Sequence, residues 1–147
     1  MKRWTDYIGV WCGTLIVNEK NEVLLLKRTD KTQWGGWWLW SRPWWTIEFG
    51  EHIEEAIKRE VKEELDVEIE LFGPRFYADD VRQEDGITKH RFTGGRFSRI
   101  IWWEVKNMEP EKHEAVQWFD INNLPSNINE YTKQSIEEFK SYKNLFM

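Results

Sequence analysis

The chain has 147 residues, of which 21 are Lys or Arg and 26 are Asp or Glu, giving a formal net charge of -5. This length suffices for one domain with a sizeable core, and the acidic balance argues against a general nucleic-acid binder, which needs a basic face. The negative charge does not exclude a small substrate that carries phosphate, because a bound divalent cation reverses the local field. The single cysteine, Cys12, excludes an intrachain disulfide and favours a reducing compartment.

Neither a secretion signal nor a membrane span is predicted. The first residues lack the charged, apolar and small-residue segments of a signal peptide. No apolar run approaches the roughly 18 residues that a transmembrane helix needs. We therefore expect a cytoplasmic protein with no membrane partner and no nucleic-acid polymer as its ligand.

The first elements along the chain are predicted to be strands. Residues 8–17 are rich in β-branched side chains, and residues 23–27 form a continuous apolar run after a polar turn. Residues 28–36 have the composition of a loop. An aromatic run that contains Pro43 follows, and a short strand is predicted at residues 46–49.

The clearest helix is predicted at residues 51–65, where apolar residues recur at helical spacing. Residues 67–78 and 96–105 predict longer strands, separated by a polar connection. Residues 116–121 predict a short strand, and residues 128–143 a second amphipathic helix.

The order of these elements indicates the fold class. Strands and helices are mixed without a regular βαβ rhythm, and the chain has neither an internal repeat nor a low-complexity linker. We predict one α/β domain over residues 1–147, in which helices cover a mixed sheet.

The predicted helix at residues 51–65 carries a group of carboxylates. Glu60, Glu63 and Glu64 stand at i, i+3 and i+4, so all three can point to one side. Their repulsion costs a few tenths of a kcal/mol per pair, which a hard divalent cation would convert into a gain. The competing interpretation is a solvated acidic face whose basic partners are interleaved along the helix. These partners are Lys58, Arg59 and Lys62.

The wider pattern resembles the Nudix box, which reads Glu, seven residues, Arg-Glu-aliphatic, one residue, Glu-Glu, one residue, Gly-aliphatic. Residues 51–67 follow this spacing. Residues 42–51, RPWWTIEFGE, resemble the upstream Pro-Gly-Gly-x-x-Glu-x-Gly-Glu, and residues 109–125 resemble the downstream Glu-x-x-x-Trp-Phe segment. The resemblance covers most of the chain and implies a MutT-like Nudix fold, a mixed β-sheet sandwiched between α-helices. The upstream positions that match are Pro43, Glu48, Gly50 and Glu51.

The resemblance also implies a chemistry. Nudix proteins hydrolyse a diphosphate that is linked to another moiety, often a nucleoside, with Mg²⁺ or Mn²⁺ as cofactor. Carried over by position, Glu60 and Glu64 would be the main metal ligands, and Glu63 would help to hold a metal or a water. Glu51 would pair with Arg59 and orient the helix.

Three positions depart from the family pattern. Trp44 and Trp45 occupy the two upstream glycine sites, and Asp66 occupies the last one. If that loop needs a positive φ, each Trp would strain it by roughly 1 kcal/mol or more. Asp tolerates the left-handed region after a helix better than most residues. The resemblance thus implies a hydrolase whose activity is impaired by the two tryptophans.

Tryptophan is the unusual feature of the composition, with 11 residues, five of them between residues 37 and 45. Core packing is one interpretation, and a pocket that stacks flat ligands is another. A membrane-interface patch is disfavoured by the missing basic collar and the negative charge. In the family, the loop that contains Glu114 contributes a further metal ligand or contacts the base. The candidate pocket residues are Trp11, Trp38, Trp40, Trp44, Trp45 and Glu114.

Glycines accompany these tryptophans. Gly94 and Gly95 interrupt a segment that otherwise predicts strand, which indicates a bulge or vacated space. Bulky residues on one side and glycines on another favour an engineered Nudix variant with a rebuilt pocket, and a natural divergent member is the alternative.

Cys12 has two interpretations, a small buried side chain or an alternative nucleophile for esterase-like chemistry. A thiolate needs a nearby base, and His52, His90 and His113 are the candidates. The spacing of the cysteine and the histidines does not fit a zinc site.

The leading hypothesis is a Mg²⁺-dependent hydrolase of a nucleoside diphosphate or triphosphate derivative. The second is a Nudix scaffold with a tryptophan-lined pocket for a flat aromatic ligand, or with Cys12 chemistry. The third is a packing variant of the fold without small-molecule function. Substrate identity is open, as is the oligomeric state, where a homodimer is one option.

Overall fold

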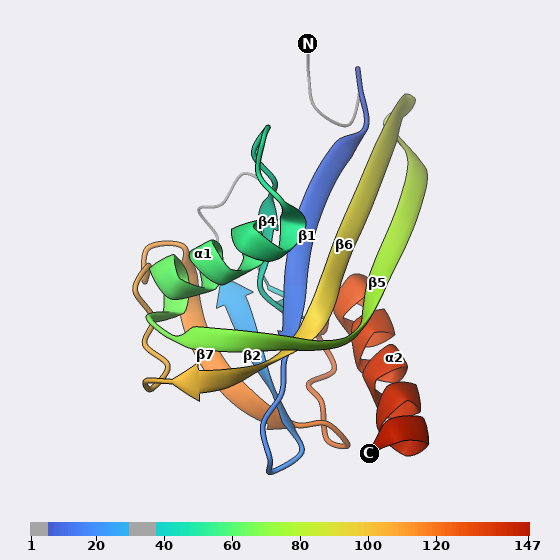
Figure 1. The fold of residues 1–147 in the computed structure, drawn as a ribbon. Helices are drawn as coiled ribbons and strands as arrows, with labels where there is room; N and C mark the ends of the chain where they lie inside the picture. Colours follow the sequence, from blue (N-terminus) through green and yellow to red (C-terminus); the bar gives the residue numbers. More distant parts are fainter. Residues whose placement is uncertain (1–5, 30–37) are drawn as a thin grey trace.

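A computed structural model describes residues 6–29 and 38–147. Seven strands and two helices are present in these ranges, in the order β1 to β4, α1, β5 to β7, α2 (Figure 1). The first strands are β1 (Gly9–Ile16), β2 (Glu22–Arg28), β3 (Trp40–Ser41) and β4 (Trp44–Thr46). After α1 (Ile53–Leu65) come β5 (Glu68–Glu84), β6 (Ile87–Trp102), β7 (His113–Asp120) and α2 (Glu130–Phe146).

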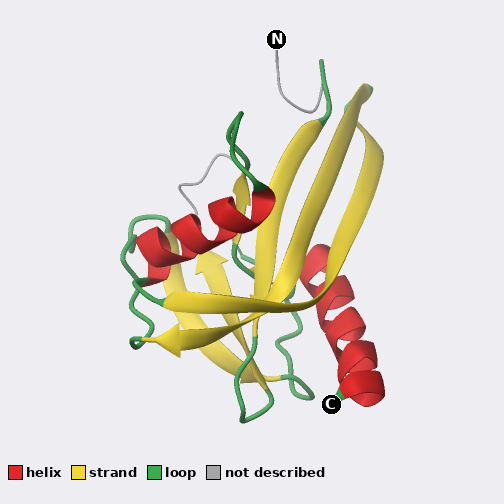
Figure 2. Cartoon of the chain, viewed as in Figure 1, coloured by secondary structure: helices red, strands yellow, loops and turns green. Residues whose placement is uncertain are grey.

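The strands form two sheets. One has the order β4-β1-β6-β5, with β1 and β6 parallel and the outer pairs antiparallel. The other is antiparallel, with the order β3-β2-β7. Helices flank the sheets on separate sides (Figure 2), so the expected mixed α/β architecture is confirmed.

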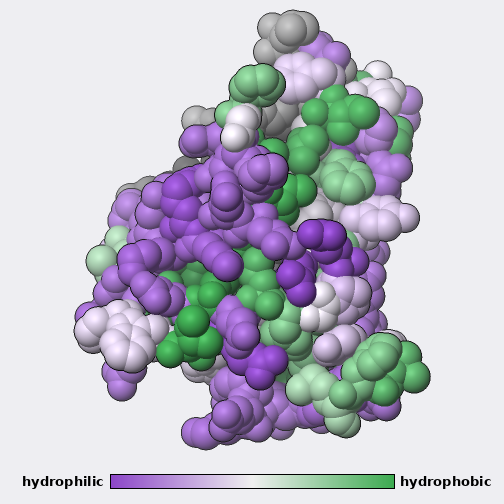
Figure 3. All heavy atoms as spheres, in the orientation of Figure 1, coloured by the Kyte–Doolittle hydropathy of each residue, from purple (hydrophilic) through white to green (hydrophobic). Residues whose placement is uncertain are grey.

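The core has two layers, one on each face of β1 and β2, because successive side chains of a strand point to opposite faces. One layer contains Cys12 and Ile16 together with apolar residues of α1, and the other contains Leu15 and Val17 together with apolar residues of α2. The outward face of α1 is hydrophilic (Figure 3), as its helical pattern predicted. The α1 residues in the first layer are Ala56, Ile57, Val61 and Leu65, and the α2 residues in the second are Ile136 and Phe139.

The main correction concerns the polar connection predicted between residues 78 and 96. Those residues extend two strands instead, and β5 and β6 form one long antiparallel hairpin whose turn contains Asp85 and Gly86, both with positive φ. Polar residues occur there because much of this hairpin is exposed, and an exposed strand needs no apolar pattern.

Smaller differences concern positions 28–49. The short strand predicted at 46–49 lies earlier, at β4, and most of the loop predicted at 28–36 falls outside the described residues. Gly94 and Gly95 sit in continuous register with β1, and the bulge lies opposite them, between Phe72 and Phe76 of β5. None of the helices in the described ranges is long and apolar enough to cross a membrane.

Candidate active site

Arg59 organises one carboxylate before α1 and two in the second half of the helix. Its Nε lies 2.7 Å from Glu51 Oε1 and a terminal nitrogen 3.1 Å from Oε2, a two-pronged bond that also lowers the pKa of Glu51. The other terminal nitrogen donates to Glu60 at 3.1 Å and to Glu63 at 3.3 Å. The expected Glu51–Arg59 pair is therefore present, and it links the segment before α1 to the helix.

The last turn of α1 brings Glu64 against a loop that follows β6. The backbone N–H of Met108 donates to the Glu64 carbonyl at 2.9 Å, and that of Lys106 donates to the Leu65 carbonyl at 2.9 Å. These bonds occupy carbonyls that a helix end leaves unpaired. They hold the loop so that Glu109 approaches the Glu64 side chain.

A cluster of three residues results, two of them buried and Glu109 half-buried. One ligand atom from each of Glu64, Glu109 and His113 lies within 4.8 Å of the other two. Glu64 and His113 are 6% and 5% exposed. The His113 position is supported by Asn107, whose side-chain amide donates to the His113 carbonyl at 2.7 Å.

The electrostatics of the cluster suit a cation. Burial raises the pKa of Glu64. The neighbouring Glu109 raises this pKa further, whereas the Trp45 indole lowers it in part. Burial also raises the pKa of Glu60, and burial followed by the Arg28 charge lowers the pKa of His113 to about 4. Packing carboxylates here without a cation is costly. A divalent cation would find deprotonated imidazole and carboxylate oxygen, which are suitable ligands.

Two buried atoms of the cluster have no hydrogen-bond partner within the described residues. They are Glu109 Oε2 and His113 Nδ1. A buried acceptor without a partner costs about 1–3 kcal/mol, so such atoms are rare without a ligand, ion or water to satisfy them. The residues present therefore fit a divalent metal.

The predicted acidic residues separate into two groups. Glu60 and Glu64 lie on the more buried side of α1, whereas the Glu63 side chain is 56% exposed and contacts Arg59. The Glu114 side chain is 45% exposed and forms an ion pair of 3.2 Å with Lys27. It is Glu109, five residues earlier in the same segment, that joins Glu64.

Arg28 is a site residue that the sequence did not indicate. It ends β2 opposite His113 in the β2–β7 register, and burial lowers its pKa while the Glu64 charge raises it. Its guanidinium carbon lies 4.4 Å from the centroid of the Trp44 ring. The positively charged Arg28 guanidinium therefore lies at the rim of the acidic cluster.

Trp44 and Trp45 belong to a strand. They pair with Gly13 and Cys12 of β1. Within the described residues, the non-glycine residues with positive φ are Asn21, Asp66, Asp85 and Trp103, so the strain considered for the two tryptophans does not arise. Asp66 adopts the left-handed conformation at the end of α1, with φ of 56°.

The candidate pocket tryptophans divide among separate environments. Trp45 is buried in the core layer of α1, while Trp11 and Trp44 contact each other edge to face with ring centroids 6.1 Å apart. Trp40 packs on Phe119 in the α2 layer, and Trp38 is 52% exposed. These five rings do not form one common wall.

Cys12 is fully buried, and burial, then the charges of Glu60 and Glu51, raise its pKa to about 12. Such a thiol stays protonated at neutral pH. The three histidines lie elsewhere: His52 occupies the N-cap position of α1 without a side-chain capping bond, His90 contacts Asp79 at 2.8 Å, and His113 belongs to the acidic cluster. The geometry gives no support to a thiol nucleophile.

Comparison with known proteins identifies this arrangement. Residues 10–139 match the NUDIX domain. The chain is 30% identical over 132 residues to the putative nudix hydrolase 1 of Caenorhabditis elegans, covering 85% of this chain and 32% of that protein. It is also 30% identical over 132 residues to the ADP-ribose pyrophosphatase of Methanocaldococcus jannaschii, covering 88% of this chain and 72% of that protein. The chain thus spans about a third of the first relative.

Solved structures share the fold. A MutT NUDIX hydrolase from Burkholderia pseudomallei superposes with a TM-score of 0.72 at 28% identity, covering 89% of this chain and 97% of that one. A MutT protein from Methanosarcina mazei Go1 gives a TM-score of 0.74 at 21% identity, covering 92% and 95%. The second likeness concerns the fold alone.

Proposed function

Because the chain belongs to the Nudix family, we propose that it hydrolyses the phosphoanhydride bond of a nucleoside diphosphate derivative with a divalent metal ion. The observation that carries this proposal is the convergence of Glu64, Glu109 and His113 beside Glu60. The Methanocaldococcus relative is named an ADP-ribose pyrophosphatase, so ADP-ribose is the first substrate to test.

Glu60, Glu64, Glu109 and His113 would hold the metal. When bound, the metal neutralises the diphosphate and lowers the pKa of the attacking water. Mg²⁺ prefers oxygen ligands, whereas Mn²⁺ and later ions accept an imidazole nitrogen more readily. The presence of His113 therefore favours Mn²⁺ over Mg²⁺ at this site.

The chain's own residues would position the reaction. Arg59 keeps Glu51, Glu60 and Glu63 in fixed orientations through hydrogen bonds of 2.7–3.3 Å. Glu63, the most exposed of them, can orient the attacking water. Arg28 can donate to the diphosphate from the opposite rim. Attack in line at phosphorus breaks the P–O–P bond, so each product keeps one phosphate.

The decisive measurement is hydrolysis of ADP-ribose and a panel of nucleoside triphosphates with Mg²⁺, with Mn²⁺ and with EDTA. We expect metal-dependent turnover that falls at least about 100-fold in Glu64→Gln, because a ligand of the metal that stabilises the transition-state charge is lost. Glu55→Gln is the matched control, since Glu55 is an exposed glutamate of the same helix. Equal turnover in Glu64→Gln and the wild type would exclude the cluster from the reaction.

Binding of the metal by a His113 nitrogen can be measured without an activity assay. Pulsed EPR of bound Mn²⁺ detects coupling to a directly bound ¹⁴N nucleus. We expect this coupling in the wild type and in His90→Gln, but not in His113→Gln. Persistence of the coupling in His113→Gln would remove His113 from the metal site.

A further inference from the structure

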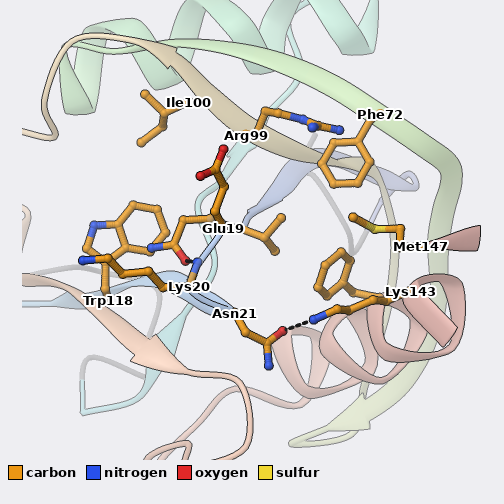
Figure 4. Close-up of a pocket in the computed structure, with 12 residues that line it drawn as sticks. Glu19, Lys20, Asn21, Phe72, Arg99, Ile100, Trp118, Lys143 and Met147 are labelled. Carbon is orange, nitrogen blue, oxygen red and sulfur yellow. Dashed lines mark hydrogen bonds between the residues drawn. The ribbon is translucent and has the colours of Figure 1, made fainter.

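A cavity lies at the turn between β1 and β2, at the opposite end of β2 from the Arg28 end that borders the acidic cluster. Figure 4 shows its lining residues. It has a volume of about 480 Å³, within the range of small-molecule sites. The turn between β1 and β2 forms one side, β5 and β6 a second, and the end of α2 a third. Trp118 of β7 closes the remaining side.

The charge of this cavity is opposite to that of the molecule. Three cations line it, Lys20, Arg99 and Lys143, and one carboxylate, Glu19. The whole chain carries a formal charge of -5, so this local excess of positive charge is a departure from the average surface. Basic side chains that converge on a concave site attract anions.

Aromatic surface adjoins these cations. Phe72 and the half-buried Trp118 line the cavity, and the Arg99 guanidinium carbon lies 4.4 Å from the centroid of the Phe72 ring. Figure 4 shows Trp118 and Lys20 on one side and Phe72 with Arg99 on another. A flat ring and an anionic group can therefore be bound together.

The rim of the cavity is held in place by hydrogen bonds. The Asn18 side chain accepts from the backbone N–H groups of Lys20 and Glu22, each at 3.0 Å. Lys143 donates to the Asn21 side chain at 2.6 Å and so ties α2 to the turn. A site ordered before binding loses less entropy when a ligand arrives.

We propose that this cavity binds a small phosphate monoester that carries an aromatic ring, of the nucleoside monophosphate type. Arg99 and Lys143 bind the phosphate, and on the other side of the cavity Trp118 and Lys20 contact the ring. Glu19 accepts a hydrogen bond from an amino or hydroxyl group of the ligand. The site is separate from the acidic cluster and needs no metal.

AMP is the probe, measured by calorimetry in EDTA with adenosine and ribose 5-phosphate as its two halves. We expect saturable AMP binding and at least about tenfold weaker binding of either half, because ring and phosphate contacts are both required. Arg99→Gln and Lys143→Gln should each weaken AMP about tenfold, through loss of a charged hydrogen bond. Glu64→Gln should bind AMP like the wild type.

Matched controls are available in the chain. Arg82→Gln removes an arginine that is 50% exposed like Arg99 and also lies over an aromatic ring, and Lys140→Gln removes another lysine of α2. Both should leave AMP affinity unchanged. If an Arg99 or Lys143 variant loses its native circular dichroism, Lys20→Gln, which should also weaken AMP binding, tests the Trp118 side of the same cavity from an exposed turn.

The proposal is overturned by absence of saturable AMP binding at millimolar concentration. Unchanged affinity in folded Arg99→Gln, Lys143→Gln and Lys20→Gln variants overturns it too. Loss of AMP binding in Glu64→Gln would assign the ligand to the acidic cluster instead. None of these outcomes bears on whether the acidic cluster hydrolyses diphosphates, which is measured separately.

Discussion

The reactivity of Cys12 is decided by its surroundings. The side chain lies in the core layer between β1 and α1, opposite Trp45 in the β1–β4 register. Desolvation penalises the thiolate, and the nearby carboxylates Glu51 and Glu60 add to that effect. The residue therefore acts as a small apolar side chain in the core.

We predict that Cys12 resists thiol reagents in the native protein. Labelling by a chromogenic disulfide at neutral pH should be at least about 100-fold slower than in denaturant, because the thiol is both buried and protonated. The rate is followed by absorbance. Fast stoichiometric labelling of folded protein would contradict this and revive the nucleophile interpretation.

Asp66 illustrates a residue in a conformation that suits glycine better. It ends α1 with φ of 56°, and its ion pair with Lys106 is long, 3.8 Å, and exposed. Such a pair contributes little to stability.

We predict that Asp66→Gly stabilises the fold by about 0.5–1 kcal/mol and that Asp66→Ala destabilises it by a similar amount, because only glycine adopts this region without strain. Denaturant unfolding of both variants measures the difference. Equal stability of the two variants would mean that the left-handed conformation is not retained in solution.

At the scale of elements, the parallel pairing of β1 with β6 depends on close backbone contact. A Cβ added to Gly95 would lie 2.1 Å from the Gly13 carbonyl oxygen and 2.9 Å from the Phe76 ring. A Cβ added to Gly94 would meet only ordinary contacts of 3.6 Å. The adjacent glycines therefore have different roles, although the sequence shows them as a pair.

We predict that Gly95→Ala destabilises the protein by about 3 kcal/mol or more, because the strands must separate to admit the methyl group. Gly94→Ala should be neutral or stabilise by about 0.5 kcal/mol, since it reduces the freedom of the unfolded chain without a clash. Thermal unfolding of the two variants side by side tests this. The reverse order of stabilities would refute the β1–β6 register.

At the scale of the whole molecule, a polar network joins the β5–β6 hairpin to α2. The Tyr131 hydroxyl of α2 donates to Asp80 of β5 at 2.6 Å, and Arg82 donates to the same carboxylate at 2.7 Å. Burial raises the pKa of Asp80, but these hydrogen bonds and the charges of Arg82 and Arg91 outweigh it, so the pKa lies below its ordinary value of 3.8.

The sign of the resulting pH dependence follows. Because the folded pKa of Asp80 is depressed, its contribution to stability is fully present above the unfolded value of 3.8 and is lost as the pH falls through the folded value. We predict that Asp80→Asn loses stability less steeply below pH 4 than the wild type does. Urea unfolding across this pH range measures the slope, and identical slopes would contradict the prediction.

Tyr131→Phe separates the hydrogen bond from the charge. Loss of the hydroxyl should cost about 1 kcal/mol at neutral pH and should keep part of the acid dependence, because Arg82 still contacts Asp80.

The sequence by itself determined the features that depend on local spacing. The helix predicted at residues 51–65 and the strands predicted at 8–17 and 23–27 follow from periodicity along the chain, and the structure has them at Ile53–Leu65, Gly9–Ile16 and Glu22–Arg28. The pairing of Glu51 with Arg59 was implied by the resemblance to the Nudix box, and it is present. The resemblance to the Nudix box, which rests on such spacing, is confirmed by the match over residues 10–139.

Only the tertiary structure decided the rest. Residues 79–84 and 87–90 became strand on either side of a turn because two exposed segments pair with each other, which no local pattern records. Glu109 and His113, rather than Glu114, reached Glu64 because loop hydrogen bonds to the end of α1 determine which side chain approaches. The tryptophans separated because strand register assigns each ring to one face of a sheet. Sequence spacing specifies neighbours within an element, whereas contacts between elements depend on pairing partners that are distant along the chain.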